Sequence, residues 1–129
     1  MRLTALVAAL VVFVAACGSD TPADETGEEL FPDVVAAEAS QGGDGTWRFD
    51  VTLSSPYDTP ARYADAWRVL APDGTELGVR ILTHDHQNEQ PFTRSLDGVE
   101  IPADVSVVTI EGRDQVSGWG GATLDVALD

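Results

Sequence analysis

Residues 46–54 read TWRFDVTLS, a stretch in which apolar and polar side chains alternate at every second position. Neighbouring side chains of an extended chain point to opposite faces, so this pattern gives one apolar face and one polar face. The apolar positions are Trp47, Phe49, Val51 and Leu53, and the polar positions between them are Arg48, Asp50 and Thr52. The stretch therefore predicts a half-buried strand in a sheet that covers a core.

Alternating runs on both sides extend this prediction. DVVAAEAS at 33–40 can form a strand joined to the first across GGDG at 42–45, because glycine tolerates the positive φ of a tight turn. RYADAWRVLA at 62–71 predicts a third strand that ends at the turn signal PDG. Its inward positions are Tyr63, Trp67 and Val69, with Asp65 as an exception on that face.

Four further strands are predicted, and the chain shows no helical periodicity after residue 33. They are ELGVRILTH (76–84), PFTRSLDG (91–98), VSVVTIEGRD (105–114) and ATLDVALD (122–129). About seven short strands separated by turn signals are typical of an immunoglobulin/fibronectin-like β-sandwich, with a jelly roll or barrel as the alternative. Trp47 or Trp67 is expected to fill the core, and packing alone must hold it because no cysteine pair exists.

The first sixteen residues predict a signal peptide. Their apolar run, residues 3–16, is too short for a transmembrane helix, which needs about 20 apolar residues. Val14-Ala15-Ala16-Cys17 resembles the lipobox of bacterial lipoproteins, in which the cysteine is lipidated on sulfur and becomes the N-terminus. The resemblance implies a lipid anchor on Cys17 at the extracytoplasmic side of the cell envelope. Gly18 and Ser19 do not resemble the aspartate signal that retains lipoproteins at an inner membrane, so an outer membrane is expected if the host has one.

The segment after the signal is acidic and has few apolar residues. It predicts a flexible tether at 17–32, followed by the sandwich domain at 33–129. Without residues 1–16, the chain has six arginines against 22 acidic residues, a formal charge of −16. Such a surface repels nucleic acid and anionic headgroups, so membrane contact is expected through the lipid and the partner is expected to be another exported protein.

A second resemblance covers about a third of the chain. RYADAWRVLAPDGTELGVRIL and HDHQNEQPFTRSLDGVEIP, between Arg62 and Pro102, resemble an uncharacterised family of small exported bacterial proteins, most sharply in EQPFTRSL at 89–96. The resemblance implies a single exported β domain and brings no activity, cofactor or catalytic residue.

The only two histidines raise the question of a metal site. On an extended strand His84 and His86 point to the same face, so both imidazoles can reach one zinc or copper ion, with Glu89 as a third ligand. The sequence favours the alternative, a polar loop from His84 to Gln90 in which Asp85 and Glu89 raise the histidine pKa values. No second ligand pair of comparable clarity exists, and no cofactor is expected on that alternative.

Catalytic interpretations are weaker, and we expect no enzyme activity. Ser95, His84 and an aspartate can be drawn as a triad, but the G-x-S-x-G elbow is absent. SGWGGA at 117–122 lacks the lysine of a phosphate loop and predicts a bulge or turn where the backbone is approached closely. Trp119, if exposed beside Tyr57, would form a partner surface.

These features predict a membrane-anchored exported lipoprotein with a non-catalytic β-sandwich that binds a partner or supports envelope structure. The alternative function is a metal-binding lipoprotein that uses His84 and His86 with zinc or copper.

Overall fold

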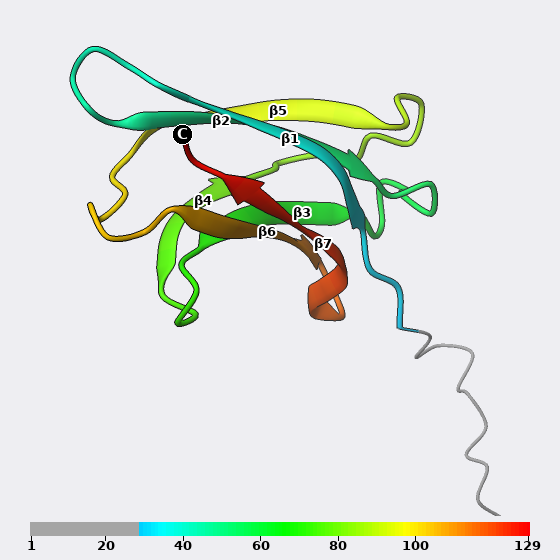
Figure 1. Cartoon of the computed structure of the whole chain (residues 1–129). Coiled ribbons are helices and arrows are strands. Elements are labelled where there is room, and N and C mark those ends of the chain that lie inside the picture. The colour runs from blue at the N-terminus through cyan, green and yellow to red at the C-terminus, as the bar shows by residue number, and fades with distance from the viewer. Residues whose placement is uncertain (1–28) are drawn as a thin grey trace, which may run out of the picture.

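The computed structural model describes residues 29–129, and this part of the chain consists of two packed antiparallel β-sheets without a helix (Figure 1). The strands are β1 (Asp33–Gln41), β2 (Trp47–Ser54), β3 (Ala64–Leu70), β4 (Glu76–Ile81), β5 (Phe92–Val99), β6 (Val107–Asp114) and β7 (Gly118–Ala127). One sheet has the order β1-β2-β5 and the other β4-β3-β6-β7. The predicted immunoglobulin/fibronectin-like sandwich of seven strands is confirmed.

The alternation in β2 places its apolar row in the core as expected. Phe49, Val51 and Leu53 have no exposed surface, whereas Arg48 points outward and pairs with Asp97. Trp67 of β3 is also fully buried, while Trp47 is only half-buried. Trp67 is therefore the aromatic residue that fills the space between the sheets.

Asp65 breaks the inward pattern of β3, and the structure shows how the strand accommodates it. The pairing of β3 with β6 shifts register between Ala64 and Ala66. A bulge at this place re-aims the intervening side chain. The Asp65 carboxylate accepts a hydrogen bond from Nε of Arg113 at 2.7 Å. A charge that the alternation alone would bury is thus paired with an arginine.

The glycine-rich segment forms the start of β7, four residues before the predicted strand. Gly121 has φ +88°, and a Cβ on it would lie 2.0 Å from the carbonyl oxygen of Pro32. A Cβ on Gly120 would meet the Phe31 ring at 2.5 Å. The predicted close backbone approach is confirmed. Phe31 and Pro32 pack on these glycines, so the ordered packing begins before the predicted boundary at residue 33.

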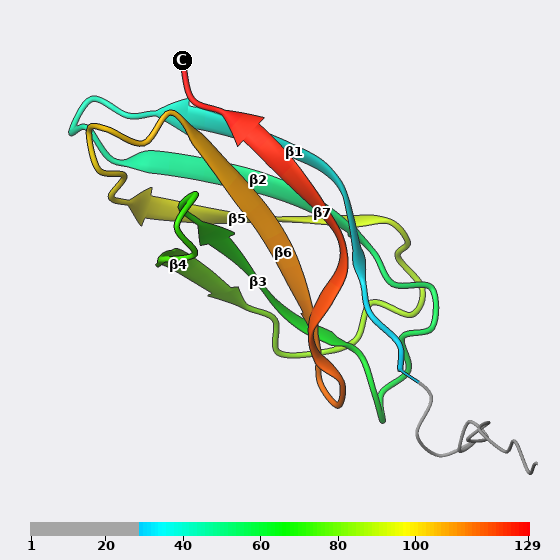
Figure 2. The ribbon, with the colours of Figure 1, turned by 60° about the horizontal axis from the view of Figure 1, so that its bottom comes forward.

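The turns gather at two opposite ends of the sandwich (Figure 2). We call the end with residues 29–32, 55–63, 82–91 and 115–117 the N-terminal end, because the Leu30 amide donates to Ser117 Oγ there at 3.3 Å. The opposite end carries the turns at 42–46 and 71–75, the loop at 100–106 and the last residues. Cys17, the lipobox and most of the predicted tether lie outside the described residues.

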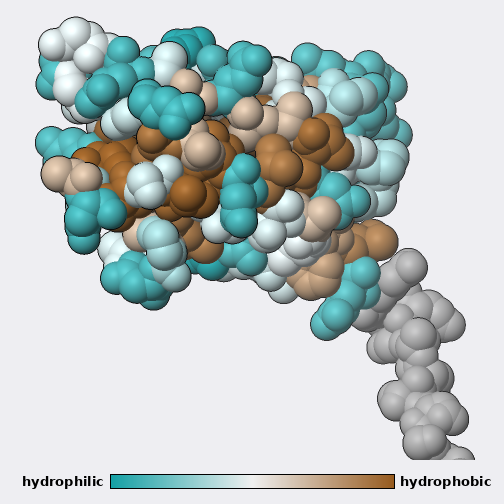
Figure 3. Space-filling view, viewed as in Figure 1, coloured by the Kyte–Doolittle hydropathy of each residue, from teal (hydrophilic) through white to brown (hydrophobic). Residues whose placement is uncertain are grey.

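An apolar band runs along the seam where β1 of one sheet lies beside β7 of the other (Figure 3). Its partly buried members are Ala37, Ala39, Leu124, Val126 and Leu128. Leu124, Val126 and Leu128 alternate with more exposed residues along the chain and pack against the core here.

Within residues 29–129 no helix has the length and the apolar character needed to cross a membrane.

Candidate functional site

Both histidines lie in the loop at 82–91 and not on a strand. The predicted strand through His84 is wrong, because β4 ends at Ile81. The Leu82 amide makes one more backbone bond to the Asp65 carbonyl of β3, and the His86 amide then bonds to the Asp58 side chain. The His84 and His86 ring centroids are nevertheless 4.8 Å apart. His86 is 4% exposed and stacks on Phe92 with ring centroids 3.7 Å apart, whereas His84 is exposed.

Asp58 fixes this loop to the loop at 55–63. It is 1% exposed, and its carboxylate accepts hydrogen bonds from the backbone amides of His86 at 3.0 Å and Ala64 at 3.1 Å. The Gln90 side chain adds bonds to the Ser55 amide and the His86 carbonyl. Buried polar groups that are satisfied in this way fix one arrangement of the two loops.

The surroundings of His86 disfavour its protonated, charged form. Burial lowers the pKa of His86, and the nearby charges of Arg94 and His84 lower it further, against the weaker influence of Glu89 and Asp58. The expected rise of the histidine pKa values is thus not found for His86. Glu89 pairs with Arg94 at 3.1 Å, which lowers the pKa of Glu89.

The predicted metal ligands are near one another but are not arranged as a ligand set. Nδ1 and Nε2 of His86 are both shielded from solvent and have no hydrogen-bond partner within residues 29–129, and the Glu89 carboxylate is bound to Arg94. Among residues 29–129 no three His, Cys, Asp or Glu side chains are brought together to hold a metal ion. The zinc or copper site stays a prediction that this geometry does not favour.

A second polar cluster lies at the same end and centres on Asp114, the last residue of β6. Asp114 is 1% exposed and accepts hydrogen bonds from Tyr57 Oη at 2.8 Å and from the amides of Val116 and Ser117. The Arg62 guanidinium pairs with it at 3.0 Å and donates to Ser117 Oγ at 2.7 Å. The cluster joins the 55–63 loop to the β6–β7 turn.

Opposing effects determine the charge of this cluster. Burial raises the pKa of Asp114, but the hydrogen bonds from Arg62, Ser117, Tyr57 and Val116 outweigh burial and lower the pKa overall. Burial, followed by the bond to Asp114, raises the pKa of Tyr57. Sequence reasoning did not find this cluster, because nothing distinguishes Asp114 among 22 acidic residues until strand pairing places it opposite Ala64.

The two aromatic residues proposed as a partner surface are half-buried and engaged. The Arg68 guanidinium lies 4.0 Å from the Trp119 ring centroid, and the Arg113 guanidinium lies 5.1 Å from it. Arg68 also pairs with Glu111 at 2.7 Å. Trp119 therefore forms part of a cation–π ladder on the outer face of its sheet, and the Tyr57 hydroxyl is bound to Asp114.

The Ser95 side chain likewise forms its hydrogen bonds within its own sheet. Its hydroxyl donates to Asp50 and accepts from Arg48 at 2.9 Å, across β2 and β5. The three polar groups satisfy one another on the outer face, and Ser95 has no hydrogen bond to His84 among the described residues.

Comparison with known proteins gives one informative similarity. A protein of Halomicrobium mukohataei named "Putative lipoprotein" is 37% identical over 112 residues. This chain is similar to it. The match takes in 84% of this chain and 55% of the relative, so the chain spans about half the length of that protein.

Comparison with family models and with solved structures adds no further relative. No family model matches the chain, and no solved structure matches it.

Proposed function

We propose that this chain is an exported lipoprotein, anchored through a lipid on Cys17, whose β-sandwich binds another exported protein without catalysing a reaction. The observation that carries the proposal is the similarity to the protein named "Putative lipoprotein" over most of the chain. The lipobox-like VAAC at 14–17 supplies the residue that the lipid would modify.

The arrangement of the sandwich supports a binding role. Several side chains with catalytic potential are engaged with one another: Ser95 with Asp50, Glu89 with Arg94, and Asp114 with Arg62. Their hydrogen bonds stabilise loops and sheet faces, and this use of polar groups is typical of a scaffold. The chain enters the sandwich at the N-terminal end, so a short tether favours an orientation in which the opposite end faces away from the membrane.

Fractionation of cells that express the full chain tests the anchor. We expect the wild-type protein in the membrane fraction and released by detergent, because acylation adds about 0.8 kcal/mol of membrane affinity per buried CH₂. The Cys17→Ser variant is expected to lose that association, and Ser19→Ala serves as the control with an intact lipobox. A Cys17→Ser protein that is exported and processed as efficiently and stays equally bound to the membrane would contradict the proposal.

A further inference from the structure

The end of the sandwich opposite residue 29 carries two adjacent hollows. One of about 480 Å³ lies between the β3–β4 turn and the β5–β6 loop, and the other of about 260 Å³ lies between that loop and the start of β2. Both are lined by Pro102 and Val105, so their floors are continuous. The remaining apolar lining comes from Ala71, Pro72, Leu77, Trp47, Ile101, Ala103 and Leu128. Thr75 in the first hollow and Gln41 and Ser106 in the second add polar surface.

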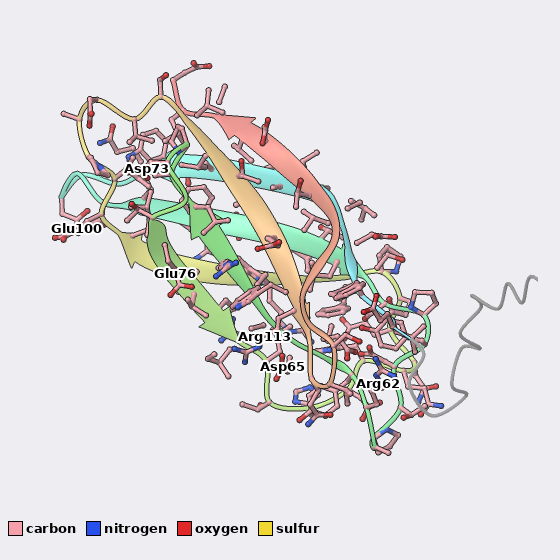
Figure 4. All side chains as sticks on the ribbon, turned by 90° about the horizontal axis from the view of Figure 1, so that it is seen from below. Arg62, Asp65, Asp73, Glu76, Glu100 and Arg113 are labelled. Carbon is pink, nitrogen blue, oxygen red and sulfur yellow. The ribbon has the colours of Figure 1, made fainter. Side chains whose placement is uncertain are left out.

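Acidic side chains border the first hollow, and none lines the second among the described residues. Asp73 and Asp104 line the first hollow, and Glu100 lies on the same loop as Asp104. In the described part of the chain no arginine forms an ion pair with any of these three carboxylates. Figure 4 shows Asp73 and Glu100 at one end of the sandwich, Arg113 near its middle and Arg62 at the other end.

We propose that this end is a docking site for an extended, basic segment of another exported protein. Aliphatic or proline side chains would occupy the two hollows, and flanking arginine or lysine side chains would pair with Asp73, Glu100 and Asp104. Apolar burial provides affinity, and complementary charge provides orientation and selectivity. Exposed hollows that combine apolar side chains with polar groups are characteristic of interaction sites.

Charge argues against the two other occupants that the chain itself could supply. A second copy would bring the same acidic end against this one, and like charges facing each other weaken association. The chain's own residues 18–29 contain five acidic residues and no arginine, so they would be repelled as well. A basic segment of a different protein is the occupant that the surface chemistry fits.

Peptide titration of the full chain in non-ionic detergent tests the docking site. The probe is a fluorescein-labelled hexapeptide, RLPRLR, and the comparison probe is ELPELE. In 50 mM salt we expect saturable binding of RLPRLR, with a Kd on the order of 10–100 μM, and no binding of ELPELE. Weakening at higher salt is expected because screening reduces interactions between exposed charges.

Variants of residues in the hollows, compared with a matched control, show whether the peptide binds at this end of the sandwich. Asp73→Asn/Asp104→Asn is expected to weaken binding about fivefold to thirtyfold, and Val105→Thr, which keeps the side-chain shape, about threefold. Glu38→Gln/Asp125→Asn removes two exposed charges from strands away from the hollows and should leave the affinity unchanged. No saturable binding up to 1 mM, or an equal loss in the control variant, would overturn the docking site.

The docking site rests on the proposed binding function, and photo-crosslinking in cells distinguishes the failure of one from the failure of the other. A crosslinking residue is placed at Pro102 in the hollows and, separately, at Val35 of β1, a residue that is 51% exposed. Crosslinks to an exported protein from Val35 alone would leave the binding function in place and overturn the docking site. Crosslinks from neither position, together with no peptide binding, would contradict both.

Discussion

His86 is an imidazole whose two nitrogens are shielded from water and have no hydrogen-bond partner among the described residues. Stacking on Phe92 and the bond from its amide to Asp58 hold the residue in this place. The neutral form is tolerated there, but a proton would introduce a charge beside Arg94 of β5 and His84, with Glu89 and Asp58 as weaker counter-charges. Protonation of His86 should therefore destabilise the fold.

This arrangement predicts a loss of stability in mild acid. The pKa of His86 is lowered below the ordinary 6.5, so below about pH 6.5 the unfolded chain binds more protons than the folded one. The free energy of unfolding should fall as pH drops from 7 to 5, by at most about 1.4 kcal/mol per pH unit from this one group. Urea unfolding at several pH values checks this.

The matched variants for that experiment are His86→Phe, which keeps an aromatic ring on Phe92, and His84→Ala, which changes the exposed neighbour. We expect the pH dependence between 7 and 5 to flatten in His86→Phe and to persist in His84→Ala. An unchanged slope in His86→Phe would show that other groups cause it.

Asp114 gives a second prediction at the scale of a residue. Asp114→Asn removes the buried negative charge that pairs with Arg62 and weakens the acceptors for Tyr57 and two backbone amides. We expect a loss of about 2–4 kcal/mol in the free energy of unfolding, measured by urea denaturation.

Asp97→Asn is the control for this pair, because the Asp97 side chain is 72% exposed where it pairs with Arg48. Its loss should stay within about 0.5 kcal/mol. Equal effects of the two substitutions would mean that the Asp114 cluster does not hold the β6–β7 turn to the 55–63 loop.

At the scale of an element, β7 shows what strand patterns can and cannot predict. Its second half, with Leu124 and Val126 inward, follows the alternation in the sequence. Its first half, GWGG, has no alternation, and it is a strand because Arg113 and Asp114 of β6 pair with Trp119 and Gly118. Pairing of this kind depends on a distant segment, so the local sequence could indicate only a close approach.

The close approach at β7 predicts a marked difference between two glycines. Gly121→Ala adds a Cβ that would strike the Pro32 carbonyl at a positive φ, so we expect a loss of at least about 3 kcal/mol in the free energy of unfolding. Gly118 has φ +90° but open space around it, so Gly118→Ala should lose only about 1 kcal/mol. Thermal and urea unfolding compare them, and similar losses in both variants would contradict the packing of Pro32 on Gly121.

The loop at 82–91 marks the limit of sequence reasoning about the candidate site. The pattern THDH indicates candidate ligands, but the apolar run before it carries no stop signal and therefore predicts a strand that continues to His84, whereas β4 ends at Ile81. The end of β4 is followed by a loop whose His86 amide bonds to Asp58, which lies 28 positions earlier in the chain. The local sequence does not predict that contact, and it does not predict the bond between Tyr57 and Asp114 either.

For the whole molecule, the alternating runs were sufficient to predict the sandwich, its seven strands and most of its core. The difference between the two ends of the sandwich was not predictable, because it depends on how turns that are distant in the sequence assemble in space. One end holds residues 29–32 and two polar clusters, and the other holds two hollows that share Pro102 and Val105, the first of them bordered by Asp73 and Asp104. This polarity suits a domain that is tethered at one end and binds a partner at the other.

Intact mass spectrometry of the full chain, extracted from membranes with detergent, tests the anchored state most directly. We expect a chain that begins at Cys17 and carries the added mass of acyl groups on that residue, removed from the spectrum by Cys17→Ser. A mature chain that begins at another residue, or that carries an unmodified Cys17, would contradict the proposed lipid anchor.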